Sequence, residues 1–134
     1  MFSEKEVDYI KSQRLARIGT VSKELQPDVA AVGFEFDGQN FYIGGIRQTK
    51  TYKYKNVANG NSRVALVIDD VESVDPWKPR GIKIHGQAEL VDRPGQFGPY
   101  LKISPTKTWS WGIERPVFED GKVVIKRPAK ERQQ

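Results

Sequence analysis

The chain has 134 residues and a formal net charge of +5, with no cysteine and a single histidine. It can therefore form no disulfide, thiolate nucleophile or cysteine-ligated metal site, and one histidine leaves little for a zinc site, so we expect no metal. No apolar run is long enough to cross a bilayer, and the N-terminus lacks the basic-then-apolar order of a signal peptide. We expect a single cytoplasmic domain at residues 1–128 and a charged tail at 129–134.

The first residues form a helix start. Ser3 is placed as the N-cap and Glu6 as its capping-box partner, while Phe2 and Val7 are spaced as a hydrophobic staple. This pattern predicts a helix from about Glu4 to Gln13.

The chain then alternates between apolar and polar residues, which is typical of strands with one buried face. We predict strands at Ala16–Ser22 and Val29–Phe36, the second opened by Pro27. In the second strand the larger side chains share one face and smaller ones lie on the other; the two sets are Val32, Phe34 and Phe36, and Ala31, Gly33 and Glu35. The small residues leave room for a flat ligand, or equally for a neighbouring strand or subunit.

A further strand begins at Phe41 and is expected to break at Gly44-Gly45. Beyond a short polar loop, a helix is predicted to begin near Thr49 and to end at Asn59-Gly60. Glycines let a ligand approach the backbone closely, so this junction between strand and helix is a candidate ligand site.

The same junction is basic and free of acids. No carboxylate occurs from Gly38 to Ile68, and this interval holds Arg47, Lys50, Lys53, Lys55 and Arg63. Cations and hydroxyls at a helix start form a site for phosphate or another fixed anion. A solvated helix face would carry the same lysines, so both interpretations stay open.

The rest of the chain contains further strands. We predict Ser62–Ile68, an irregular segment from Asp69 to Pro79, and strands at Gly81–Val91, Leu101–Ser104 and Lys107–Glu114. Asp120-Gly121 between two short apolar runs predicts a hairpin with a type I′ turn. Together these elements indicate a mainly β fold, a small antiparallel barrel with short helices.

Few residues suggest acid–base or nucleophilic chemistry. His85 lies in the middle of a predicted strand, where a partly exposed structural role is more common than catalysis, and we assign no catalytic residue. Such a composition favours a reaction carried by a cofactor. Trp77, Trp109 and Trp111 fill a core or an interface, or else form the walls of a substrate pocket.

The order of these pieces resembles the pyridoxamine 5′-phosphate oxidase-like FMN-binding split barrels, in particular their branch of probable F420-dependent enzymes. The most telling segment is Thr51-Tyr52-Lys53-Tyr54-Lys55-Asn56-Val57, which is similar to the family pattern Ser/Thr-x-Lys-x-Arg-Asn-aliphatic. Similar segments include Arg63–Val67, Pro79–Glu89 and Trp109–Ile113. The resemblance implies a homodimer of six-stranded antiparallel split β-barrels, with a flavin or deazaflavin between the subunits.

The resemblance also implies roles for individual residues. Thr51 and Lys53 would hold the cofactor phosphate, with charge added by Lys50, and Arg80 would approach from the next barrel strand. Lys78 is expected at the cofactor on electrostatic grounds, since Lys50, Lys53, Lys78 and Arg80 together form a basic rim. The strand residues and glycines would line the ring, namely Ala30, Ala31, Val32, Gly44, Gly45 and Gly81. Nothing corresponds to the oxidase's substrate-binding C-terminal arginine and histidine pair, so oxidation of pyridoxamine phosphate is not expected.

The function expected on these grounds is hydride transfer between coenzyme F420, or alternatively FMN, and an unidentified small organic acceptor. The lysine-rich rim suits the phosphodiester and glutamate tail of F420. A protein that carries a flavin, F420 or haem-like molecule without turnover would use the same sites. A nucleic-acid-binding barrel ranks last, since the cations gather at one point rather than along a groove, and neither nucleic acid nor membrane is expected as a partner.

Overall fold

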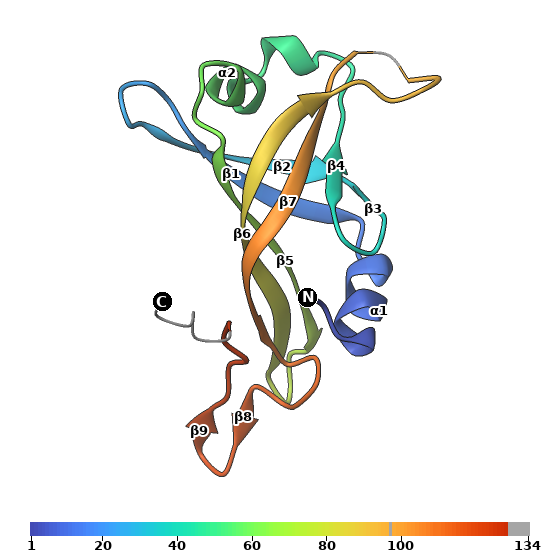
Figure 1. Cartoon of the computed structure of the whole chain (residues 1–134). Helices are drawn as coiled ribbons and strands as arrows, with labels where there is room; N and C mark the ends of the chain where they lie inside the picture. Colours follow the sequence, from blue (N-terminus) through green and yellow to red (C-terminus); the bar gives the residue numbers. More distant parts are fainter. Residues whose placement is uncertain (97, 129–134) are drawn as a thin grey trace, which may run out of the picture.

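In the computed structural model, which describes residues 1–96 and 98–128, one curled antiparallel sheet dominates the protein (Figure 1). The elements in chain order are α1 (Glu4–Ser12), β1 (Leu15–Val21), β2 (Pro27–Gly33), β3 (Glu35–Phe36), β4 (Phe41–Ile43), the 3₁₀ helix η1 (Gln48–Lys50), α2 (Tyr52–Ala58), β5 (Arg63–Ser73), β6 (Lys78–Val91), β7 (Tyr100–Trp111), β8 (Phe118–Glu119) and β9 (Lys122–Val123). The predicted tail at 129–134 lies outside the described residues. In the part of the chain that the structure describes, no helix is long and apolar enough to span a membrane.

The helix start predicted at the N-terminus is confirmed. The Ser3 side chain accepts a hydrogen bond from the Glu6 backbone N–H, and the Glu6 carboxylate accepts one from the Ser3 N–H. Glu6 is only 2% exposed and also pairs with Lys126 at 3.2 Å, so the cap ties the C-terminal segment to α1.

The sheet has the order β2-β1-β5-β6-β7-β4-β3, and its two edge strands are consecutive in the chain. Only Phe34 separates β2 from β3, so the segment 27–36 lies at both ends of the sheet and curls it into a barrel. The mainly β split-barrel fold is thus confirmed, and the strand count changes for a local reason. The predicted strand Val29–Phe36 is split at Phe34, which gives seven strands in the sheet instead of six.

Two predicted boundaries were wrong. The segment after Ile68 is not irregular, because β5 continues to Ser73 and Asp70 pairs with Arg80 on β6. The two strands predicted around Pro105 are one strand, β7. Pro105 pairs with Gly86 where the register between β6 and β7 shifts, and such an irregularity tolerates a residue without an N–H.

The predicted hairpin near the C-terminus is confirmed. Asp120 and Gly121 both have positive φ, 50° and 74°, as a type I′ turn requires, and they join β8 to β9. Lys126 then pairs with Ser110 of β7 through two backbone hydrogen bonds of 2.8 and 2.9 Å.

The core lies inside the curled sheet. Each central strand contributes alternate apolar side chains that are buried, including Ile18, Leu66, Ile84 and Ile103. Phe41 is fully buried and stacks on Phe36 with 4.7 Å between ring centroids. The opposite face of the same strands remains open, which is where small residues such as Gly19 and Ala65 lie.

Candidate functional site

Lys53 is the predicted phosphate ligand with the most unusual environment. It lies in the first turn of α2 and is only 9% exposed, whereas Lys55 on the same helix is exposed. Burial lowers the pKa of the Lys53 ammonium below its ordinary value, and the Asp28 carboxylate partly offsets that shift. Among the hydrogen bonds of the described residues, none involves this ammonium. A buried cation without a hydrogen-bonded anion gains from binding one.

Thr51 has a structural role in the free chain, and its role at the phosphate stays a prediction. It is the N-cap of α2: its hydroxyl accepts from the Tyr54 N–H at 3.3 Å and donates to the Gln48 carbonyl at 2.7 Å. The single hydroxyl proton is therefore used inside the chain, and the oxygen could only accept a hydrogen bond from a ligand. The helix itself begins at Tyr52, three residues later than the predicted start at Thr49.

Gln48 was missed in the sequence. It is 2% exposed, and its Nε2 donates to the Ile43 carbonyl at 2.9 Å. Its Oε1 is buried, and no donor reaches it among the described residues. A buried acceptor without a donor is costly, so this oxygen is a second polar group next to α2 whose hydrogen bonding is incomplete. No sequence pattern singles this residue out, since an isolated glutamine in a polar loop is ordinary.

The glycines have partners inside the chain. A Cβ on Gly44 would lie 2.6 Å from the Tyr100 ring, and one on Gly81 would lie 2.5 Å from the Trp111 ring. A Cβ on Gly45 would come within 3.3 Å of Gln48 Oε1. The packing of Tyr100 and Trp111 is enough to require glycine at the first two positions, without any ligand.

The ring-lining residues predicted on β2 point in different directions. Val32 is 8% exposed and belongs to the core, and Ala30 is partly buried against it. Ala31 is exposed on the opposite face. A ring at this strand would therefore contact the Ala31 side chain and only the backbone of its two neighbours.

Arg80 forms an ion pair inside the chain. Its guanidinium makes a bidentate pair with Asp70, at 2.8 and 2.9 Å, and lies 5.1 Å from the centre of the Tyr9 ring. The Tyr9 hydroxyl donates to Asp70 at 2.9 Å. The hydrogen bond from Arg80 lowers the pKa of Asp70, and burial raises that of Tyr9. This network joins α1 to β5 and β6.

The predicted basic rim is divided within one chain. Ser62, just beyond α2, bonds to Ala88 on β6, so α2 lies near that part of the strand. Arg80 is eight residues earlier, about 25 Å away along an extended strand. Figure 1 shows α2 at one end of the long sheet and the turn that precedes β6 at the other. Lys53 and Lys50 therefore do not share a pocket with Arg80 and Lys78 in a single chain.

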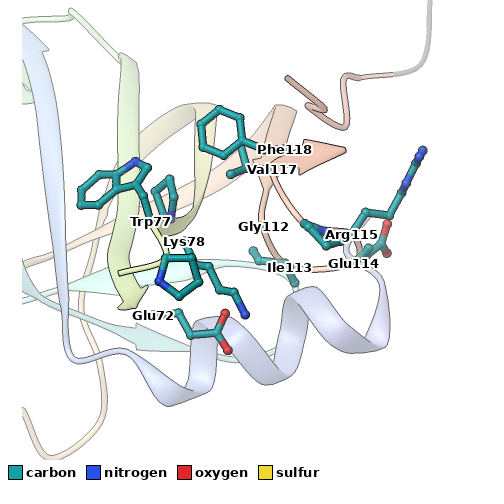
Figure 2. A pocket seen from close by; sticks show the side chains of 12 residues that line it. Glu72, Trp77, Lys78, Gly112, Ile113, Glu114, Arg115, Val117 and Phe118 are labelled. Atoms are coloured by element: carbon teal, nitrogen blue, oxygen red, sulfur yellow. The ribbon is translucent and has the colours of Figure 1, made fainter. Parts of the chain in front are cut away.

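The tryptophans are also separated. Trp109 and Trp111 lie on the outer face of β7, as their spacing predicts, and Trp109 contacts Lys83 and His85 at 4.2 and 4.7 Å from the ring centre. Trp77 is in the turn between β5 and β6 and is 53% exposed. Together with Lys78 it lines a pocket of about 410 Å³ (Figure 2).

The sequence model of the pyridoxamine 5′-phosphate oxidase family matches residues 2–133. The chain belongs to this family. The family resemblance predicted from the sequence is therefore confirmed.

Individual proteins are similar to this chain in sequence or in fold. The chain is 35% identical over 121 residues to a 5a,11a-dehydrotetracycline/5a,11a-dehydrooxytetracycline reductase from Streptomyces rimosus, with 84% of each protein covered. A conserved hypothetical protein from Mycobacterium tuberculosis shares the fold with a TM-score of 0.68 and 22% identity, over 84% of this chain and 86% of that one. An F420 reductase gives a TM-score of 0.57 and 21% identity, over 72% and 89%.

The α2 region fits the cofactor class that this family implies. A flavin or deazaflavin nucleotide carries a phosphate, which suits the buried Lys53 ammonium, and hydrogen-bond donors, which suit Gln48 Oε1. Asn56 belongs to the segment 51–57 that is similar to the family pattern. Its side chain donates to the Thr20 hydroxyl at 2.9 Å and anchors α2 on β1. The helix that holds Lys53 is thus fixed to the barrel by a buried polar contact.

Proposed function

We propose that this protein is an oxidoreductase that binds coenzyme F420, or alternatively FMN, and transfers hydride to a small unsaturated organic acceptor. The observation that carries the proposal is Lys53, a buried ammonium on α2 without a hydrogen-bonded anion among the described residues. The cofactor supplies the hydride chemistry when bound, and the chain contributes binding and orientation.

In this proposal the phosphate accepts a hydrogen bond from Lys53, and Lys50 adds positive charge from the exposed surface of η1. Gln48 Oε1 accepts from an N–H of the bound molecule or from a water that it orders. Ala31 and the β2 backbone contact the ring. F420 is preferred to FMN because the segment Gly38–Ile68 has no acid to repel its additional negative charges, and because an F420 reductase shares the fold.

The proposed assembly is a homodimer. Since Arg80 and Gly81 lie far from Lys53 within one chain, a site that uses both ends of the sheet needs a second copy. The outer face offers a surface for it: Val29 is 70% exposed, and with Gly19, Ala65 and His85 it lines a shallow depression of about 690 Å³. Small and apolar residues let two sheets approach closely.

One relative supports a class of acceptor. A protein 35% identical to this chain is a reductase of 5a,11a-dehydrotetracycline and 5a,11a-dehydrooxytetracycline, and 5a,11a-dehydro denotes a double bond between two ring carbons. We infer that the acceptor here also has a carbon–carbon double bond conjugated to a ring carbonyl. Hydride then adds to one carbon, the electron pair moves toward the carbonyl oxygen, and a proton from water completes the reduction.

The test is a parallel titration of the protein with F420 and FMN, followed by cofactor fluorescence. Lys53→Met is expected to weaken binding by roughly ten- to a hundredfold, because a charge-assisted hydrogen bond contributes about 1.5–3 kcal/mol. Lys55→Met is the matched control, since Lys55 is exposed on the same helix. Equal effects of the two substitutions would contradict the assignment. Tight binding without turnover of any acceptor would favour a carrier protein instead.

A further inference from the structure

A pocket lies between the β5–β6 turn and the segment that joins β7 to β8, at the end of the sheet opposite α2 (Figure 1). Its volume of about 410 Å³ lies within the usual range for small-molecule sites. Most of its lining is apolar, namely Pro76, Trp77, Pro79, Ile113, Pro116, Val117 and Phe118.

Two large aromatic side chains are left open at this pocket. Trp77 is 53% exposed and Phe118 is 50% exposed. In Figure 2 their rings lie on one side of the hollow with Val117, and Glu72 and the Lys78 ammonium lie on the other. Flat walls formed by aromatic and proline rings favour a flat ligand, because stacked rings bury the most area.

The charges around the pocket are not equivalent. Arg115 is paired with Glu119, and Glu114 is paired with Lys126 at 3.3 Å. The side-chain ammonium of Lys78 takes part in none of the ion pairs or hydrogen bonds found among the described residues. It is therefore the lining cation that is available to a ligand, and an ammonium donates to a carbonyl or enolate oxygen.

The pocket is built on a close contact between strands. Gly112, which follows β7, has φ of +69°, and a Cβ there would lie 2.3 Å from the Pro79 carbonyl oxygen. The backbone after β7 therefore packs closely against the start of β6. Arg80 and Gly81 follow immediately on β6, and the family resemblance assigns both to the cofactor. A ligand in the pocket would lie beside that segment, about 25 Å from Lys53 of the same chain, so hydride would reach it from a cofactor held by the second copy of the proposed homodimer.

We propose that this pocket binds the acceptor, a flat conjugated ring ketone, with Trp77 and Phe118 as its walls and Lys78 on the carbonyl oxygen. The inference rests on the proposed function. When hydride adds to the conjugated system, the electron pair moves to the carbonyl oxygen, Lys78 stabilises the resulting enolate, and water supplies the proton. Lys78 thus acts on the acceptor, in place of the cofactor role predicted for it as part of the basic rim.

The first experiment measures binding of menadione, a flat conjugated ring ketone, by calorimetry without any cofactor. The chain has no cysteine for this compound to alkylate. Trp77→Ala and Phe118→Ala are each expected to weaken binding by roughly five- to tenfold. Val74→Ala and Val123→Ala are matched controls, since both valines are exposed and neither lines the pocket: Val74 is in the same turn as Trp77, and Val123 on β9 is the cross-strand partner of Phe118. No binding, or equal effects of all four variants, would overturn the proposal.

The second experiment uses the cofactor identified by titration, with menadione as the acceptor. Trp77→Ala should raise KM for menadione, Lys78→Met should lower kcat, and Lys78→Arg should restore most of it, while cofactor affinity stays unchanged in all three. Weaker cofactor binding by Lys78→Met or Trp77→Ala would assign the pocket to the cofactor and overturn the inference. Failure of the proposed function would look different, because menadione would bind while neither F420 nor FMN did.

Discussion

Two basic side chains of this barrel, Lys53 on α2 and Arg80 on β6, were predicted to serve one site, and their surroundings are opposite. Arg80 is held by both oxygens of Asp70 and lies against Tyr9. Lys53 is more deeply buried and has no such partner among the described residues. A cation that is paired with a carboxylate inside the chain stabilises the fold, whereas a buried cation without a hydrogen-bonded anion favours a ligand. Position in a charge-rich sequence does not separate the two cases.

The largest expected contrast comes from the same substitution at both positions. Arg80→Met should lower the free energy of unfolding by about 2–3 kcal/mol, because it leaves the Asp70 carboxylate with only part of its hydrogen bonds. Lys53→Met should leave stability unchanged or slightly higher, because it removes a buried charge. Urea unfolding of both variants measures the difference. Equal losses would show that Lys53 also has a structural partner.

The next prediction uses pH to test the α2 region. Burial lowers the pKa of Lys53 in the free protein, and a bound phosphate would raise it again. Cofactor affinity should therefore be full below the lowered pKa and decline as the pH rises through it, earlier than an ordinary lysine would titrate. The dissociation constant measured from pH 7 upward tests this. A Lys53→Arg variant that binds should lose the decline.

The Arg80 network gives the complementary pH dependence. Its hydrogen bonds lower the pKa of Asp70 in the folded protein, so they contribute stability above the unfolded pKa, and this contribution is lost as the pH falls through the folded pKa. Tyr9→Phe removes one of these bonds and should cost about 1 kcal/mol near neutral pH. Unfolding followed across acidic pH should show a smaller loss on acidification in Tyr9→Phe than in the unaltered protein.

The smallest expected effect is at Gln48. Gln48→Met removes a hydrogen bond to Ile43 and also the buried oxygen without a donor, so stability should change by less than about 1 kcal/mol. Cofactor affinity should nevertheless fall severalfold, if this oxygen accepts from the bound molecule. An unchanged affinity would restrict the role of Gln48 to shaping the loop around Gly45.

Much of the fold was predictable because its signals are local. The capping box at Ser3 and Glu6, the Asp120-Gly121 turn and the alternation in β1 and β6 each involve residues close together in sequence. The order of the motifs identified the family.

The sequence alone therefore determined the helix start, the hairpin, most of the strands and the acid-free run of lysines. The tertiary structure decided which of those lysines is buried, that Arg80 binds Asp70, that Tyr100 and Trp111 cover the glycines, and that Trp77 lines a pocket with Phe118. Those outcomes depend on which distant segments the curled sheet brings together. Burial and pairing of a charge are set by such neighbours, and spacing along the chain does not contain them.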